Sequence, residues 1–583
     1  MDSKHIVPPR AEDQPDQVFQ QTYDCVVVGS GHAGSCAALA AKNAGCTSDE
    51  SNRVYSRLHD AELSDCRASN GPAGLGSAVL IIDKCPEEWA GGNGYFTAGA
   101  HRTAHGGLAD LVPLLVNASP AAQLSRERLA SIDVEPYTAD EFSADINRLG
   151  GERADPDMVR AMVEGSREAL RWLAETARLP FVLSFNRQAY EVDGRMKFWG
   201  GMALSVEEGG KGLIEAWRNA VKAAGVETKY NTEALRVVVA GDEGREQVSG
   251  IIVREEGQER TITTRSIVLA AGGFEANKEM RRKHLGENWI NAKVRGTPYN
   301  TGDGFEIARA LGAKMVGDWA GCHSTAWDAH AASETGNREL TNQYTKSGYP
   351  LGVMINIDGK RFVDEGEDFR NYTYAKFGRA ILEQPEGCAF QVWDAKVVSR
   401  LREEEYGDGV VKKAWAPSVE ELAEVLVQQE WGLKDKRQVI DTLHEFNNAV
   451  RAARSEANTA GREDAPWNPA IKDGYTTQST HTRLAIPKSN WALTIEDGPL
   501  MAVKVACGIT FTFGGVAVDP KTAEVISERT GRSIPGLFCT GEMVGGLFYG
   551  NYPGGSGLTA GAVFGIRAGQ NAADRAGKVA SYT

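Results

Sequence analysis

The sequence lacks three features that would each point to a particular class of protein. It has no uninterrupted run of about 18 apolar residues, so we expect no segment to span a membrane. It has no basic stripe, and its 64 Lys plus Arg against 78 Asp plus Glu argue against nucleic acid as the main partner. Residues 1–20 lack the apolar core of a secretory signal and are expected to form a disordered polar tail.

Cysteine is sparse and scattered along the chain. The nine cysteines include no C-x-x-C pair and no spacing typical of metal ligands, so the sequence predicts neither a metal site nor a dithiol centre. Single cysteines in apolar settings, such as Cys25, Cys36 and Cys539, are typical of buried side chains in a reducing compartment. We therefore expect a cytoplasmic protein.

Glycine, in contrast, is abundant, with 65 residues that gather at a few points. Clustered glycine often marks backbone that approaches a large ligand closely. Hydrophobic residues at 42% and charged residues at 24% are typical of a soluble globular protein. The length of 583 residues suits two domains, with a change of composition at about 321–501.

The first glycine cluster follows a short apolar strand. Residues 23–28 form the sequence YDCVVV, GSGHAG follows at 29–34, and an alanine-rich helix is expected over 35–44. Strand, G-x-G-x-x-G and helix in this order are the fingerprint of a dinucleotide-binding unit. Its glycines permit a tight turn, and the N–H groups that begin the helix bind a pyrophosphate.

The acidic residue expected to bind a ribose comes late in the chain. A strand over 78–83 ends in Asp83, which lies 49 residues after Gly34, whereas the usual separation is about 20. The polar stretch 46–77 between them is either a genuine inserted loop or an intron retained in the translated gene. If this stretch displaces Asp83, the nucleotide site fails.

Hydrophobic periodicity predicts further elements between the glycine clusters. Helices are expected at 155–179, 211–224, 374–382, 419–431, 436–453 and about 557–576. Strands are expected at 226–230, 234–240, 250–254, 261–264, 266–274 and 516–519.

Eight motifs occur in a fixed order along the chain. They are GSGHAG (29–34), LIIDK (80–84), GGN (91–93), VLAAGGF (268–274), NTGDGFEIA (300–308), GKRFVDE (359–365), IPGLFCTGE (534–542) and NYPGGSGL (551–558). This set resembles the FAD-dependent oxidoreductase 2 family of fumarate reductase and succinate dehydrogenase flavoproteins. The likeness is strongest to tricarballylate dehydrogenase flavoproteins, through RGTPYNTGDG (295–304), the stretch 364–379 and PKSNWA (487–492).

The resemblance implies an α/β fold in which a Rossmann-like FAD-binding domain is split between 21–320 and 502–583. An α+β capping domain for substrate would occupy 321–501. Within the FAD site, the resemblance places Asp83 at the adenosine ribose, Ala234 at the adenine, Asn93 at the ribityl chain and Glu542 at FAD hydroxyls. The full set so implied is Gly29, Gly31, Ala33, Gly34, Asp83, Lys84, Gly91, Gly92, Asn93, Gly94, Gly99, Ala234, Ala271, Gly272, Asp303, Phe511, Gly541, Glu542, Gly557 and Leu558.

The resemblance also implies how FAD is attached. Succinate dehydrogenases bind flavin covalently through a His in the segment that matches 91–98. This segment has no His here, and the nearest are His101 and His105. We therefore expect non-covalent FAD.

The implied substrate site departs from that of fumarate reductases. His323 matches the first substrate His of the family, but Thr510 replaces the second and Tyr552 replaces a substrate-binding Arg. Thr and Tyr donate hydrogen bonds but carry no charge at neutral pH, so a carboxylate would lose two partners.

The proton-carrying Arg of the family has three candidate positions. Arg370 and Arg379 follow Glu365 at plausible spacings, whereas the best helix alignment places Tyr374 at the catalytic position. A phenol in that role would resemble Δ1-ketosteroid dehydrogenases. A packing role for Tyr374 stays open.

We expect an enzyme that forms or reduces a C–C double bond next to a carboxylate or carbonyl by hydride transfer at flavin N5. A tricarballylate- or fumarate-like polycarboxylate is the leading substrate. One alternative is a Δ1-ketosteroid-dehydrogenase-like desaturase or ene-reductase of a secondary metabolite. Another is a non-catalytic or FAD-free protein, caused by the insertion at 47–77. The expected partners are a small-molecule substrate and an unidentified electron donor or acceptor.

Overall fold

The computed structural model describes residues 18–44, 78–242, 246–459 and 468–580. The expected insertion at 46–77 lies outside these residues. Strand β1 (Val18–Tyr23) begins inside the range expected to be a disordered tail, because it pairs in parallel with β13 (Gln258–Thr264). The disordered tail predicted for 1–20 is therefore wrong for residues 18–20.

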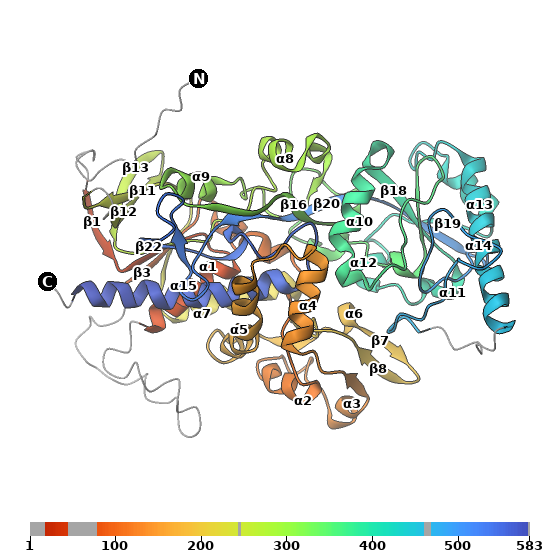
Figure 1. Cartoon of the computed structure of the whole chain (residues 1–583), viewed down its shortest axis with the longest axis horizontal. Coiled ribbons are helices and arrows are strands. Elements are labelled where there is room, and N and C mark those ends of the chain that lie inside the picture. Colours follow the sequence, from red (N-terminus) through yellow and green to blue (C-terminus); the bar gives the residue numbers. More distant parts are fainter. Residues whose placement is uncertain (1–17, 45–77, 243–245, 460–467, 581–583) are drawn as a thin grey trace.

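A six-stranded sheet forms the centre of the nucleotide-binding half (Figure 1). In spatial order its strands are β10 (Glu227–Lys229), β3 (Val79–Ile82), β2 (Cys25–Val28), β14 (Ile267–Leu269), β22 (Ser533–Cys539) and β21 (Glu524–Ile526). All pair in parallel except β21. The buried valine and isoleucine runs of β2 and β3 are typical of a parallel sheet covered on both faces. Both ends of the chain thus build one sheet.

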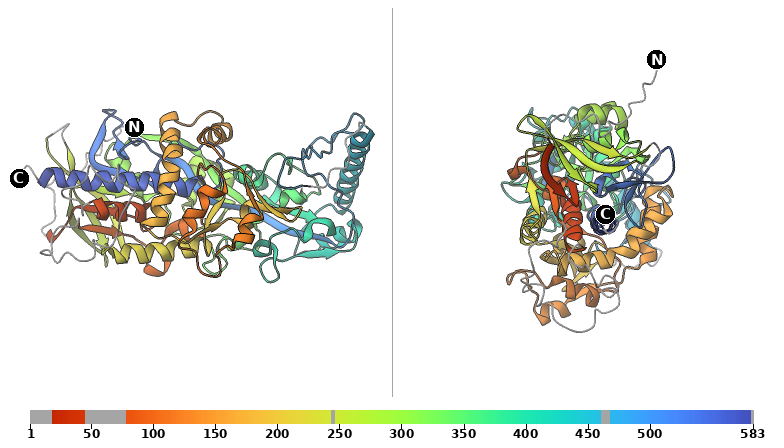
Figure 2. Two further views of the ribbon diagram at one scale, coloured as in Figure 1. Left: turned by 90° about the horizontal axis from the view of Figure 1, so that it is seen from below. Right: turned by 90° about the vertical axis from the view of Figure 1, so that its left-hand side faces the viewer.

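Two helices from opposite ends of the chain pack closely beside this sheet. They are α1 (His32–Ala44) and α15 (Ser556–Ala580), and α15 runs the length of the nucleotide-binding half (Figures 1 and 2). A Cβ built on Gly569 would lie 2.1 Å from the carbonyl oxygen of Ala37, and one on Gly565 would lie 2.8 Å from that of Ala33. The lack of a side chain at these two glycines therefore allows α15 to approach α1 closely, and this contact holds α1 behind the first glycine turn.

A second sheet and a helical lobe surround the central sheet. The second sheet has the order β1, β13, β12 (Gln247–Glu255) and β11 (Thr232–Ala240). The lobe contains α2 (Leu108–Leu111), α3 (Arg126–Ala130), α4 (Ala139–Gly150), α5 (Pro156–Glu175), α6 (Phe185–Gln188) and α7 (Gly209–Ala223). Its small sheets are β4 (Ala100–His101), β9 (Leu204–Val206) and β6 (Phe181–Leu183), and β5 (Ile132–Val134), β8 (Arg195–Phe198) and β7 (Ala189–Val192).

Two long strands connect the nucleotide-binding half with the region of residues 321–501, which we call the cap as a label only. Strands β16 (Met315–Asp328) and β20 (Leu500–Val516) pair antiparallel and extend across the middle of the molecule (Figure 1). Around them lie β15 (Lys293–Val294), β17 (Val353–Asn356), β18 (Cys388–Trp393) and β19 (Ala414–Ala416). The nearby helices are α8 (Lys278–Leu285), α9 (Asp303–Ala310), α10 (Tyr374–Leu382), α11 (Ala395–Val398), α12 (Glu403–Tyr406), α13 (Val419–Leu426) and α14 (Lys436–Thr459).

The strand predicted at 516–519 was misplaced, because β20 precedes it and ends at Val516. Glycines concealed β20 in the sequence. A Cβ on Gly508 would lie 2.8 Å from the Trp327 ring, and one on Gly514 would lie 2.5 Å from the Trp319 ring. Glycine inside a strand marks such a close approach. In contrast, α10 covers the predicted range 374–382.

Among the described residues, no helix is long and apolar enough to cross a bilayer.

We expect Gly569→Ala to lower the melting temperature. Alanine has a higher helix propensity than glycine by about 1 kcal/mol, but overpacking against α1 costs about 1–3 kcal/mol. The exposed Asp574→Ala on the same helix is the control and should leave the melting temperature nearly unchanged. The melting temperatures are measured by circular dichroism. A Gly569→Ala variant with a higher melting temperature than the unaltered protein would contradict the close packing of α1 and α15.

Candidate functional site

A single continuous cavity extends from the first glycine turn to the cap. Its walls come from segments far apart in sequence, including the β2–α1 turn, the end of β3, β16, β20, α10 and the start of α15. Every residue that the family motifs assigned to FAD lines this cavity except Gly34 and Gly99. His323, Tyr374, Thr510 and Tyr552 line it as well. The structure therefore brings the predicted nucleotide and substrate residues together.

The glycine turn forms a concave end of the cavity. Gly29 has a φ of 109°, and a Cβ there would lie 2.3 Å from the carbonyl oxygen of Ala270. Gly34 lies inside α1, where a Cβ would be 2.0 Å from the carbonyl oxygen of Gly29. Gly31 faces the cavity, with its nearest Cβ contact at 3.6 Å. The turn thus leaves backbone accessible at the N-terminus of α1, as a pyrophosphate requires.

Asp83 points toward this turn. Its Oδ2 accepts hydrogen bonds from the N–H of Ser30 at 2.8 Å and from the Ser30 hydroxyl at 2.7 Å. Its Oδ1 accepts from the N–H of Cys85 at 3.0 Å. Beside it, Lys84 forms an ion pair with Asp303. The carboxylate therefore lies beside the first glycine turn, despite its large separation from Gly34 in sequence.

Two neighbouring carboxyl groups lie near the middle of the cavity, where Glu542 lines the wall and Glu275 is fully buried behind it. Glu542 Oε1 accepts from the N–H and the hydroxyl of Thr512, at 2.7 and 3.1 Å. Asn93 and Asn300 donate to Glu275 Oε1, and Asn93 also donates to the carbonyl of Thr510. Burial raises the pKa of Glu275 to about 7. Burial and the neighbouring Glu275 raise the pKa of Glu542 well above its usual value. This region therefore presents hydrogen-bonding groups suited to cofactor hydroxyls.

His323 lies among three aromatic rings at the cap end. Its ring centroid is 4.8 Å from that of Tyr552, 5.8 Å from that of Phe511 and 5.9 Å from that of Tyr374. Burial and the nearby Arg295 guanidinium lower the pKa of His323 well below its usual value. The imidazole is therefore neutral at neutral pH, and its buried Nδ1 has no hydrogen-bond partner in the described structure.

Arg295 is a cavity residue that the sequence analysis did not select. Its Nη1 donates to the Thr510 hydroxyl at 3.0 Å, and its Nη2 donates to Asn342 Oδ1. The residue is only 8% exposed and forms no ion pair with any carboxylate among the described residues. Burial lowers its pKa to about 10, which still leaves the guanidinium charged at neutral pH. The sequence feature that could have pointed to Arg295 is its position at the start of the family-like motif RGTPYNTGDG (295–304).

Arg187 is a second cavity residue that the sequence did not reveal. It lies in α6, and it donates to Glu405 at 2.5 Å and to Glu404 at 2.8 Å. Both carboxylates belong to α12 in the cap. No motif or spacing in the sequence indicates this long-range pairing.

The three proton-carrier candidates occupy different environments. Tyr374 lines the cavity. Arg370 is buried outside the cavity wall and donates to the Ser347 hydroxyl at 3.2 Å. Arg379 donates to the carbonyl of Ala320 at 3.0 Å and lies over the Trp289 ring. Of the three, only Tyr374 can meet a ligand in the described cavity.

A dinucleotide cradle that continues into a pocket with a buried cation is typical of a flavin-dependent oxidoreductase. The chain belongs to the FAD binding domain family, which matches residues 128–558. This confirms the predicted FAD cofactor and the mixed α/β fold class, and the glycine cradle and Asp83 described above fit the group.

Several known proteins are similar over most of the chain. A probable fumarate reductase of Shewanella frigidimarina is 27% identical over 95% of this chain and 76% of its own length. The NADH:fumarate oxidoreductase of Klebsiella pneumoniae is also 27% identical, but this chain covers only 49% of it. The open conformation of a flavocytochrome c3 fumarate reductase matches with a TM-score of 0.62 and 25% identity, over 96% of this chain and 79% of that chain.

The 3-ketosteroid Δ1-dehydrogenase from Sterolibacterium denitrificans shares the fold. Its TM-score is 0.64 at 19% identity, over 95% of this chain and all of that chain. The fold therefore occurs both in a fumarate reductase and in a ketosteroid dehydrogenase, and the residues of the cavity must decide the substrate.

Asp83→Asn should weaken FAD binding by roughly ten- to a hundredfold, since a hydrogen bond to a charged group contributes about 1.5–3 kcal/mol. Titration of the apoprotein with FAD, followed by flavin fluorescence, measures this change. Asp133→Asn is the control, because Asp133 pairs with Arg195 away from the cavity. Equal FAD affinity of Asp83→Asn and the unaltered protein would show that Asp83 does not contact the nucleotide.

Proposed function

We propose that the protein forms or reduces a C–C double bond next to a carboxylate of a small substrate. The observation that carries this proposal is Arg295, a buried cation without a carboxylate partner at the cap end of the FAD cavity. A buried charge is costly unless an opposite charge meets it, so a substrate carboxylate is the expected partner. Relatives named for fumarate and acrylate, from Klebsiella pneumoniae and Vibrio harveyi, support a carboxylate substrate.

The residues around Arg295 are arranged to hold this carboxylate. Arg295 contributes the charge, and the Thr510 hydroxyl and the neutral His323 contribute hydrogen-bonding groups beside it. Positive charge and donors on the carboxylate oxygens make the neighbouring C–H bond more acidic. FAD bound in the cavity supplies the hydride acceptor or donor. Arg295 would thus supply the positive charge that is missing at Thr510 and Tyr552.

Tyr374 is the proposed proton carrier. Its side chain lines the cavity next to His323, and the arginines Arg187 and Arg295 line the same cavity. Tyr374 would accept a proton when the C–C double bond forms and donate one when it is reduced.

A second candidate function is the dehydrogenation of a larger cyclic ketone. The paired cavity tyrosines Tyr374 and Tyr552 favour it, as does the fold shared with a ketosteroid dehydrogenase. The unpaired charge of Arg295 favours the carboxylate, because an apolar ketone would leave this buried cation without a partner.

We further propose that FAD is held without a covalent bond. His101, the His nearest to the segment 91–98, is buried outside the cavity wall, and its Nδ1 lies 2.9 Å from the carbonyl of Gly99.

The seven cysteines among the described residues are buried free thiols, which supports a reducing compartment such as the cytoplasm.

Tyr374→Phe should lower turnover by about 10²–10⁴-fold, the usual contribution of a general acid or base. FAD affinity should stay unchanged, because only the phenol oxygen is lost. The half-reaction is measured from flavin absorbance under anaerobic conditions, by mixing the chemically reduced FAD-loaded protein with fumarate or acrylate, or the oxidised FAD-loaded protein with tricarballylate. Tyr190→Phe is the control, since Tyr190 stacks on Trp199 outside the cavity. Unchanged turnover of Tyr374→Phe would remove it from the mechanism.

Arg295→Gln should raise the Kd for a carboxylate by about ten- to a hundredfold, because a charge-assisted hydrogen bond is lost. Arg295→Lys should give a smaller increase, since it keeps the charge without the planar fork. His323 should add no pH dependence to this affinity across neutral pH, because its lowered pKa keeps the imidazole uncharged there. Equal affinity in Arg295→Gln and the unaltered protein would place the carboxylate elsewhere.

A further inference from the structure

Glu275 and Glu542 form a pair of carboxyl groups at the middle of the FAD cavity. Glu275 follows β14 and is fully buried, whereas Glu542 lies in the short 3-10 segment Gly541–Met543 and lines the cavity. A Cβ built on Gly273 would lie 1.9 Å from Glu542 Oε1. The Glu542 carboxyl therefore packs against the backbone two residues before Glu275, where only glycine leaves room for it.

The donors around this pair leave one buried oxygen without a partner. Glu275 Oε1 accepts from the side-chain amides of Asn93 and Asn300. Glu542 Oε1 accepts from the N–H and the hydroxyl of Thr512, at 2.7 and 3.1 Å. Glu275 Oε2, in contrast, is buried with no donor, although the Glu542 carboxyl lies within hydrogen-bonding reach of Glu275. Two carboxylates are acceptors only, so a proton on one of them is needed to satisfy this oxygen.

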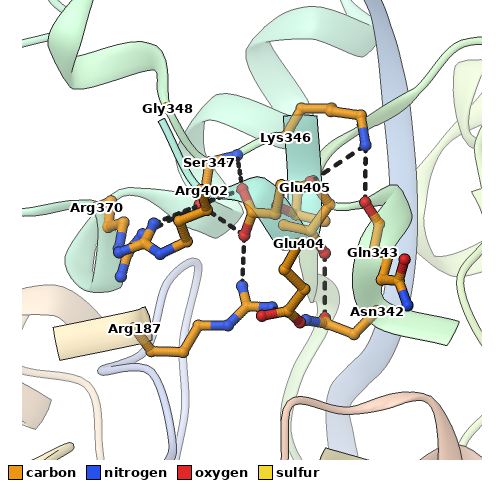
Figure 3. Close-up of polar contacts among 12 residues, drawn as sticks. Arg187, Asn342, Gln343, Lys346, Ser347, Gly348, Arg370, Arg402, Glu404 and Glu405 are labelled. Atoms are coloured by element: carbon orange, nitrogen blue, oxygen red, sulfur yellow. Dashed lines mark hydrogen bonds and ion pairs between the residues drawn. The ribbon is translucent and has the colours of Figure 1, made fainter. Parts of the chain in front are cut away.

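The pair also lacks the cation that neutralises another buried carboxylate of this protein. Glu405 is fully buried, and it accepts from the Arg187 guanidinium at 2.5 Å and from the N–H of Ser347 at 2.8 Å (Figure 3). Neither Glu275 nor Glu542 forms an ion pair with a cation in the described stretches of the chain. Two adjacent carboxyl groups cannot both ionise at low cost in a buried site, and they titrate as a unit that retains a proton.

The charged and titratable groups around the pair favour one negative charge rather than two. Arg281 on α8 is fully buried; burial lowers its pKa, and the negative charge of Glu275 is among the effects that oppose this. Burial raises the pKa of Cys322 on β16 well above its usual value, so this thiol adds no charge. Lys84 and Asp303 form an ion pair with each other. One buried guanidinium can thus compensate one carboxylate of the pair.

We propose that Glu275 is a positioning residue that keeps Glu542 protonated, so that Glu542 faces FAD as a neutral carboxylic acid and not as a carboxylate. Glu275 holds the negative charge behind the cavity wall, and the Glu542 hydroxyl donates to its free oxygen. The wall then adds no negative charge beside a cofactor whose pyrophosphate is itself anionic. This proposal depends on the FAD cofactor and is independent of the proposed substrate.

The first test compares Glu542→Gln with the unaltered protein at neutral pH. The Kd for FAD is measured by diluting the FAD-loaded full-length proteins and following the fluorescence of the released flavin. The Gln side chain can donate to Glu275 as the protonated acid does, and it still accepts from Thr512. We therefore expect the two Kd values to agree within about threefold. A larger loss of affinity, like that expected for Asp83→Asn, would show that FAD requires a carboxylate at this position and would overturn the proposal.

The second test is the pH profile of FAD affinity in Glu275→Gln. Without its charged neighbour, Glu542 should ionise between mildly acidic and neutral pH and place a negative charge on the cavity wall. We expect the Kd for FAD to rise by about tenfold or more across this range, whereas the unaltered protein should change by less than about threefold. His32 adds no titration near neutral pH, because burial lowers its pKa to about 4.

The double variant Glu275→Gln/Glu542→Gln separates positioning from a merely structural role. It contains no carboxyl at the pair, so its profile should be as flat as that of the unaltered protein. Glu279→Gln, at an exposed position of α8, is the matched control and should also give a flat profile. A flat profile for Glu275→Gln, or a rise that persists in the double variant, would overturn the proposal. If Glu275→Gln does not fold, the Glu542→Gln comparison decides alone.

Discussion

The buried guanidinium of Arg295 is the interaction on which the site depends. It lies at the cap end of the cavity, is bonded to Thr510 and Asn342, and has no carboxylate partner in the described chain. A charge removed from water without an opposite charge destabilises a protein by several kcal/mol, on the order of the net stability of a domain. The surrounding fold must therefore offset the free-energy cost of burying this cation, and a bound anion would lower that cost.

Long strands provide this support. β16 carries His323 and β20 carries Thr510, and their pairing places both side chains beside Arg295, which follows the short strand β15. The same two strands continue toward the glycine turns, where Asp83, Asn93 and Glu542 line the other part of the cavity. This one pair of strands thus connects the nucleotide part of the cavity with the pocket around Arg295, and hydride transfer would require such a defined separation.

The glycine turn at one end of the cavity could be predicted from the sequence because glycine requirements are local. The turn at Gly29 and the close contact at Gly34 are encoded within six residues, and the GxGxxG context identified them. Asp83 could be placed only because its strand is continuous and apolar. Ordered motifs from the family then supplied Glu542 and Tyr374, which local patterns alone do not reveal.

Charge partnership, in contrast, is a tertiary property. Nothing in the sequence around Arg295 shows that it lacks a carboxylate, and nothing around Arg187 shows that it meets Glu404 and Glu405. Strand β20 was missed because Gly508 and Gly514 resemble a loop until Trp327 and Trp319 are seen packed over them. These features depend on segments that come together only in the folded chain.

The most direct measurement is a crystal structure of the FAD-loaded protein with malonate, a dicarboxylate without a C–C bond to desaturate. A carboxylate of malonate within hydrogen-bond distance of the Arg295 guanidinium, at the cap end of the cavity, is the expected result. Malonate bound away from Arg295, or an Arg295 that pairs with a carboxylate of the protein, would contradict the assignment of this cation to the substrate.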